Sequence, residues 1–130
     1  MNIPFLPFMK THLVLSTANE TVRIMPDCII CITSDGNYSN LVQTDNVIRM
    51  VTCQLGQIET MIHDQKVETE SSRFIRIGKS LIVNSRYIYY INVQKQKLML
   101  SDARTFTHDV SASKEALRQL KEYLEKEGKQ

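Results

Sequence analysis

The chain has 130 residues, of which 42% are hydrophobic, and its formal net charge at pH 7 is +2. These values are typical of one globular domain with a packed core, and they exclude a disordered chain. No apolar run approaches the roughly 18 residues that a membrane helix needs, so the sequence predicts a soluble, cytoplasmic protein with no membrane partner.

The positive charge is concentrated in one block of the chain. Residues 1–72 carry four Lys or Arg against eight Asp or Glu, whereas residues 73–104 carry seven against one. From residue 105 onward the charges balance at five against five. A basic block inside an otherwise neutral domain is how a surface for a polyanion shows itself in a sequence.

The three cysteines are Cys28, Cys31 and Cys53. An odd number of cysteines in a chain without a signal peptide indicates reduced thiols. Cys28 and Cys31 resemble half of a zinc site, but no second pair completes it. We therefore expect small buried side chains, with no metal, no cofactor and no redox catalysis.

Residues 1–11 form an apolar lead with two prolines and no basic start, so they make a poor signal peptide and we expect a flexible or partly docked segment. Residues 12–17 and 21–25 then predict a hairpin, because aliphatic and β-branched residues flank a polar turn. After the break at Pro26-Asp27, residues 28–33 form a nearly continuous apolar run, which is typical of a buried strand.

Two more strands are expected at residues 38–43 and 47–51, separated by turn signals such as Asp35-Gly36. Five short strands at this spacing predict an antiparallel, meandering sheet and exclude a βαβ fold. A helix follows, for which Thr52 is a plausible N-cap, and its apolar positions should pack it against the sheet. Residues 64–72 lack any period and are expected to form a loop.

Residues 73–84 contain two apolar segments on either side of Gly78-Lys79-Ser80. Gly78 removes a Cβ where the backbone must turn, and Lys79 and Ser80 place a charge and a hydroxyl at the tip. Such a turn suits recognition of an anion. The alternative is a surface turn that Lys and Ser keep soluble.

Three further strands are expected at residues 87–93, 97–101 and 105–110, and together they fit a meander. A closing helix should run from about residue 113 to 127, with Ser111 and Ser113 as possible N-caps. Residues 128–130 would form a short tail, so that the folded domain spans residues 12–127.

The order of these motifs resembles the LytTR family of bacterial DNA-binding domains. The resemblance rests on Asp35-Gly36-Asn37-Tyr38-Ser39, then on Phe74-x-Arg76-Ile77 followed by Ser80-x-Ile82-Val83-Asn84, and last on Val110-Ser111 before the closing helix. It implies a mainly β fold with small helices, in which elongated antiparallel sheets are stacked. It also implies a transcriptional regulator that binds double-stranded DNA, commonly at direct repeats, with self-association on the DNA.

In this family three loops enter successive major grooves. Carried onto this chain, they predict the DNA-contact residues Asn37, Tyr38, Ser39 and Asn40 in the first loop, Arg76, Gly78, Lys79 and Ser80 in the second, and Ser111, Ser113 and Lys114 in the third. The resemblance implies neither a cofactor nor a small-molecule substrate.

The chain departs from the family at three points. Gly78-Lys79 stands where His-Arg is usual, and Ala112 stands where an Arg usually follows Val-Ser. Lys lacks the planar fork of Arg, so base-edge contacts are reduced. About a dozen residues precede the first strand, so we also expect no receiver domain.

Each candidate also has a structural interpretation. The residues from Asn37 to Asn40 could simply form the turn, Arg76 could pair with a carboxylate inside the fold, and Asn84 should cap a turn. The residues Lys95, Lys97, Arg86 and Arg104 are expected to be solvated, with one or two of them contacting phosphates. The tyrosines at positions 87, 89 and 90 are expected in the core or in cross-strand pairs.

Other functions remain open from the sequence. One is a protein-interaction or regulatory module that has kept the fold and lost DNA binding. Another is single-stranded RNA binding, which requires exposed tyrosines in the strand at residues 87–93. An enzyme is not expected, because no catalytic triad, paired carboxylates or Gly-rich phosphate loop stands at motif spacing.

Overall fold

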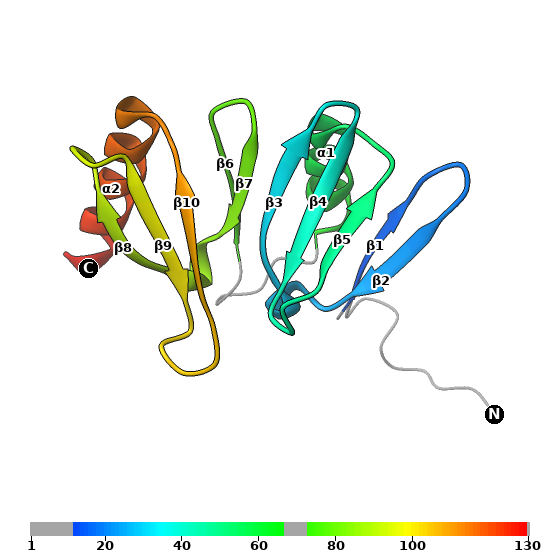
Figure 1. Ribbon diagram of the computed structural model, residues 1–130, viewed down its shortest axis with the longest axis horizontal. Coiled ribbons are helices and arrows are strands. Elements are labelled where there is room, and N and C mark those ends of the chain that lie inside the picture. Colours follow the sequence, from blue (N-terminus) through cyan, green and yellow to red (C-terminus); the bar gives the residue numbers. More distant parts are fainter. Residues whose placement is uncertain (1–11, 67–72, 130) are drawn as a thin grey trace.

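The computed structural model describes residues 12–66 and 73–129 (Figure 1). The lead at residues 1–11, most of the loop expected at residues 64–72, and Gln130 lie outside the described residues. The strands are β1 (Leu13–Ser16), β2 (Thr21–Ile24), β3 (Ile29–Asp35), β4 (Tyr38–Gln43), β5 (Ile48–Val51), β6 (Phe74–Ile77), β7 (Leu81–Asn84), β8 (Ile88–Asn92), β9 (Lys97–Ser101) and β10 (Thr107–Ser111). The helices are α1 (Leu55–Gln65) and α2 (Lys114–Gly128), and single 3-10 turns span Pro26–Cys28 and Ser85–Tyr87.

The strands form three antiparallel sheets that follow one another along the long axis of the molecule (Figure 1). The hairpin β1-β2 stands at one end, a five-stranded sheet in the order β5-β4-β3-β7-β6 lies in the middle, and the meander β10-β9-β8 stands at the other end. The mainly β fold with a mid-chain helix and a C-terminal helix is confirmed.

The expectation that the first five strands share one sheet is wrong, because β7 lies beside β3. The reason is that β3 is buried on both faces and needs a partner on each edge. The equally buried β7 fills that edge, whereas β1 and β2 pair with each other.

The five-stranded sheet separates two hydrophobic cores. On one side Ile29, Ile32 and Ile82 pack with the hairpin β1-β2 and with α1, and on the other Leu81 and Val83 pack with the meander and with α2. The side chains of β7 therefore alternate between the two cores, as a pleated strand requires. Burial on both faces explains why this strand is continuously apolar in sequence.

Helix α1 has its N-cap two residues later than expected. Its N-cap is Gln54, whose side chain forms a capping box with Gln57, and the helix continues to Gln65. The expected N-cap, Thr52, instead donates its backbone N–H and its hydroxyl to the carboxylate of Glu20. These hydrogen bonds lower the pKa of Glu20. The end of α1 is tied to β1, because the Gln65 side chain bonds both the N–H and the carbonyl of Val14, at 2.9 and 2.6 Å.

The three cysteines differ in burial. Cys31 and Cys53 are buried and Cys28 is half-buried, and none of the three forms a disulfide. Burial raises the pKa of the Cys31 thiol to about 12. No group of three or more His, Cys, Asp or Glu in residues 12–66 and 73–129 could hold a metal ion.

Chain direction places several turns on one side of the molecule. In Figure 1 the turns β3-β4, β6-β7 and β8-β9 and the connection from β10 to α2 all lie along the upper side. Strand β1 begins at the lower side, whereas helix α2 runs down from the upper side and ends at the left, about half-way down. Neither α1 nor α2, the two helices described, is long and apolar enough to cross a membrane.

Candidate functional site

Four of the connections on the upper side of Figure 1 form what we call the turn edge. It consists of the β3-β4 turn (residues 36–37), the β6-β7 turn (residues 78–80), the β8-β9 turn (residues 93–96) and the β10-α2 connection (residues 112–113). The first two turns are neighbours, because the N–H of Ser34 donates to the carbonyl of Ser80 at 2.9 Å. The last two are linked by Gln96, whose side chain donates to the carbonyl of Ala112 at 3.4 Å. The three loops predicted from the sequence therefore lie on one edge of the molecule.

The β3-β4 turn is a tight hairpin turn with Gly36 at φ +64°. A positive φ at the first of two central residues is the geometry of a type II′ turn, which explains the glycine. Asn37 follows and is exposed, and its side-chain oxygen accepts a hydrogen bond from the Gln54 amide at 3.2 Å. The bond holds one end of the Asn37 amide at the N-terminus of α1 and fixes its orientation.

The other three candidates of this loop differ in exposure. Tyr38 is 45% exposed, and Asn40 is half-buried within β4. Ser39 is fully buried, and its hydroxyl donates to the carbonyl of Cys53 at 2.8 Å. We therefore leave Ser39 out of the contact set, because it joins β4 to the segment before α1 and has no surface to offer a ligand.

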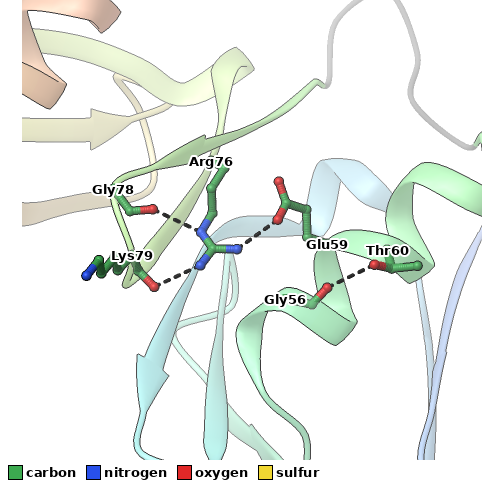
Figure 2. Close-up of polar contacts among 6 residues, drawn as sticks. All are labelled: Gly56, Glu59, Thr60, Arg76, Gly78 and Lys79. Carbon is green, nitrogen blue, oxygen red and sulfur yellow. Dashed lines mark hydrogen bonds and ion pairs between the residues drawn. The ribbon is translucent and has the colours of Figure 1, made fainter.

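The β6-β7 turn presents Gly78, Lys79 and Ser80, all of which are exposed. Gly78 adopts φ +63°, and a Cβ added there would meet nothing within 4 Å. The glycine thus serves the backbone conformation of the turn and not a close approach within the fold. Figure 2 shows the Lys79 side chain extending away from the rest of the turn.

The Arg76 guanidinium forms hydrogen bonds with three groups of the same chain (Figure 2). It donates from Nε to the carbonyl of Gly78 at 3.1 Å, from Nη2 to the carbonyl of Lys79 at 2.9 Å, and from Nη1 to Glu59 Oε1 at 2.8 Å. Of the two interpretations open from the sequence, the structure places Arg76 in an internal ion pair. Its side chain keeps 28% of its surface exposed.

The third loop leads into α2. Ser113 is the N-cap of this helix, because its hydroxyl accepts from the N–H of Ala116 at 3.1 Å. Ser111 ends β10 and Lys114 begins the helix, and both are exposed. A helix N-terminus carries partial positive charge and unpaired N–H groups, and Lys114 adds a full charge beside them.

The basic block of residues 73–104 divides between the two sides of the molecule. Lys95 lies in the β8-β9 turn, on the turn edge, where the sequence alone left it among several solvated cations. Arg104 lies in the β9-β10 loop on the opposite side. Lys97 and Arg86 have carboxylates within 3.8 and 3.9 Å, on Asp109 and Asp27. Counting strands would have identified Lys95, because every second turn of a meander falls on the same edge.

The tyrosines are expected in the core or in cross-strand pairs, and Tyr87 meets the first alternative while Tyr90, which pairs with Met99 of β9, meets the second. Tyr87 is buried, and its ring meets Phe106 edge-on with centroids 5.0 Å apart. Tyr89 and Tyr90 are 62% and 45% exposed. The pairing of β8 with β9 shifts register between Ile88 and Tyr90, so Tyr89 has no partner in this register and differs from the expectation.

Comparisons with known proteins agree with this architecture. The family described as the LytTr DNA-binding domain matches residues 19–125. A solved structure of a LytTr DNA-binding domain from Bacillus cereus is similar with a TM-score of 0.56 at 17% sequence identity, over 88% of this chain and 97% of that one. No curated protein sequence matches the chain.

Proposed function

Because this chain belongs to the LytTR family of DNA-binding domains, we propose that it regulates transcription by binding double-stranded DNA along the turn edge. The observation that carries the proposal is the exposure of Asn37, Lys79 and Lys114 on three different connections that share one edge. In residues 12–66 and 73–129, no helix lies along this edge, so the turns themselves would enter successive major grooves.

The candidates divide by chemistry into two groups. Lys79, Lys95 and Lys114 supply charge for phosphates, which fix the position of a protein on the duplex. The amide of Asn37 and the hydroxyls of Ser80 and Ser111 can bond base edges or phosphates. Tyr38 and Asn40 would border the first loop, and the backbone of Gly78 and the capped helix start at Ser113 would approach the sugar-phosphate chain.

Discrimination between bases would depend on few side chains. An amide such as Asn37 can pair with adenine through two hydrogen bonds, and a lysine such as Lys79 can bond guanine but cannot supply a fork. Phosphate contacts would supply most of the affinity. We propose that bound sites are direct repeats, since two weak half-sites read together compensate for the small number of base contacts in each.

The test is a selection of genomic fragments with the purified protein, followed by mobility-shift titration of the enriched fragments at low salt. Enrichment of a common motif, with binding weakened by Asn37→Ala on that motif more than on random duplex, supports the proposal. Failure to retard any duplex at low salt contradicts it and favours the protein-interaction module.

The exposed Tyr89 and Tyr90 meet the requirement set for single-stranded RNA binding. Exposed aromatic rings can stack on bases, at about 1–3 kcal/mol for each base. A single-stranded RNA oligonucleotide is therefore the competitor to use in the titration. We expect it not to displace the duplex, and displacement that is lost in Tyr89→Ala would assign the protein to RNA.

A further inference from the structure

We propose that Arg76 is a positioning residue, which together with Glu59 fixes the β6-β7 turn so that Lys79 and Ser80 face the DNA. This inference rests on the proposed function of the turn edge. It assigns to Arg76 a role through other residues, in place of the phosphate contact that its position in the sequence motif suggests.

The Arg76 guanidinium forms what we call the clamp, a set of hydrogen bonds to Gly78, Lys79 and Glu59. Three different nitrogens of one guanidinium bond the carbonyls of two successive turn residues, Gly78 and Lys79, and the carboxylate of Glu59 (Figure 2). The planar, rigid fork of arginine can make these bonds at once, whereas a lysine ammonium cannot. With both carbonyls held toward Arg76, the Lys79 side chain extends to the other side of the turn.

Glu59 anchors the clamp to helix α1. Glu59 lies in α1 beside Ile58, which is fully buried in the core between α1 and the five-stranded sheet. The position of Glu59 is therefore fixed by the packing of the helix. The β6-β7 turn, with its glycine at φ +63°, is also held at Ser80, whose carbonyl accepts from the Ser34 N–H at 2.9 Å, but this bond does not reach Gly78 or Lys79. The Arg76–Glu59 ion pair, at 2.8 Å, thus ties the turn to α1 and not only to its own hairpin.

Arg76 and Glu59 carry opposite charges and form an ion pair. The carboxylate of Glu59 offsets the charge of the Arg76 guanidinium, so the pair contributes little to the field that attracts DNA. In the β6-β7 turn itself, Lys79 is then the cation that can release counterions from a phosphate. If Arg76 contacted a phosphate, it would have to give up hydrogen bonds that the free protein already makes.

These two roles differ in their dependence on salt. A residue that neutralises one phosphate contributes about 0.9 to the slope of log K against log salt, whereas a positioning residue changes affinity without changing the slope. The variant that separates them is the double substitution R76Q/E59Q, which removes both charges and keeps the net charge unchanged. R76K keeps the positive charge but loses the fork, and K79Q serves as the matched loss of one phosphate contact.

The experiment measures fluorescence anisotropy of a labelled duplex from the selected fragments, between about 50 and 200 mM salt. For R76Q/E59Q we expect about tenfold weaker binding, equivalent to about 1.4 kcal/mol, with the wild-type slope. We expect R76K to bind as weakly as the double variant, and K79Q to have a slope less steep by about 0.9. A shallower slope in R76Q/E59Q, restored in R76K, would assign Arg76 to a phosphate and overturn the proposal.

A second measurement needs no DNA. NMR order parameters of the Gly78, Lys79 and Ser80 backbone in the free protein should fall in R76Q/E59Q and stay unchanged in K79Q. Unchanged order parameters in the double variant overturn the proposal whatever the DNA titration shows. If the order parameters fall but the wild-type protein binds no duplex, the positioning role of Arg76 stands and the proposed function fails. Thermal unfolding of each variant shows that the fold itself is retained.

Discussion

The side-chain amide of Asn84 joins three backbone segments inside the protein. Asn84 is fully buried, and its nitrogen donates to the carbonyls of Pro26 and Ile29, at 3.2 and 3.0 Å. Its oxygen accepts from the N–H of Arg86 at 3.0 Å and so caps the 3-10 turn that follows, as the sequence predicts. The Asn84 side chain thus supplies hydrogen-bond partners to backbone groups before β3, at its first residue, and in the turn between β7 and β8.

We predict that Asn84→Ala destabilises the protein by about 2–3 kcal/mol, because buried backbone groups lose their partners. The measurement is the urea midpoint followed by circular dichroism. Asn19→Ala, an exposed asparagine in the β1-β2 turn, is the control and should change stability by less than about 0.5 kcal/mol. Equal effects of the two substitutions would contradict the role given to the Asn84 amide.

We predict that the thiols of Cys28, Cys31 and Cys53 differ in reactivity because they differ in burial. Cys28 is half-buried in a 3-10 turn, whereas burial raises the pKa of Cys31 to about 12 and also raises the pKa of Cys53. Because the thiolate is the reactive form, maleimide at pH 8 should modify Cys28 first and Cys31 last. Peptide mass spectrometry of the native and urea-unfolded protein measures the order, and modification of Cys31 as fast as Cys28 in the native protein would be inconsistent with it.

The roles of Ser39 and Arg76 depend on partners far along the chain. Local sequence shows a hydroxyl after a turn and a cation in a strand, and both suit a DNA surface. The carbonyl of Cys53 and the carboxylate of Glu59 are 14 and 17 residues away from them. Only the fold brings these groups together, so the sequence can place the loops of the site but not decide which of their side chains remain free.

At the scale of elements, the alternation of apolar residues and the turn residues in the sequence are enough to predict the bounds of a strand that lies between two turns. Strands β4 (Tyr38–Gln43) and β9 (Lys97–Ser101) have the bounds expected from alternation between turn signals. The N-cap of α1 could not be predicted in this way. Thr52 is hydrogen-bonded to Glu20, which lies 32 residues away in the sequence, and so it does not cap the helix. The order of strands in the central sheet was also beyond local patterns, since β7 reaches β3 across α1.

The β9-β10 loop is an element held by one carboxylate. Asp102 accepts hydrogen bonds from the Thr105 hydroxyl and from the N–H groups of Arg104, Thr105 and Phe106, and these bonds hold its pKa well below the usual range. Because the pKa is lower in the folded state, its contribution to stability is present above the unfolded-state pKa of about 3.9 and is lost as the pH falls through the folded-state pKa.

We therefore predict that Asp102→Ala lowers the thermal midpoint at pH 7 and that the difference from the wild-type protein narrows below about pH 4. Scanning calorimetry at pH 7, 5, 4 and 3 measures it. Other carboxylates titrate in both proteins and cancel in the comparison. A difference that stays constant down to pH 3 would argue against the carboxylate as the source.

At the scale of the whole molecule, the distribution of charge determines how binding responds to salt. With Lys79, Lys95 and Lys114 on the turn edge and further contacts at the N-terminus of α2, one bound copy would neutralise about five phosphates. We predict a slope of log K against log salt of about −4 to −5 for the wild-type protein. Lys79→Ala should flatten it, whereas Arg104→Ala, in the loop on the opposite side, should leave it unchanged.

Titrations of these two variants over a series of salt concentrations measure the effect. Because the substitutions remove the same charge, their comparison separates contact from net charge. Equal slopes for the two variants would remove the turn edge from the interface.

The direction in which the chain enters β1 and leaves α2 has a practical consequence. Strand β1 begins on the side away from the turn edge, and α2 runs away from that edge toward its last residue (Figure 1). A bulky reporter, such as a fluorescent protein joined after α2, would lie beyond the end of this helix and leave the turn edge unobstructed. The protein can accordingly be immobilised on a sensor chip through that end, with its turns presented to DNA flowing past.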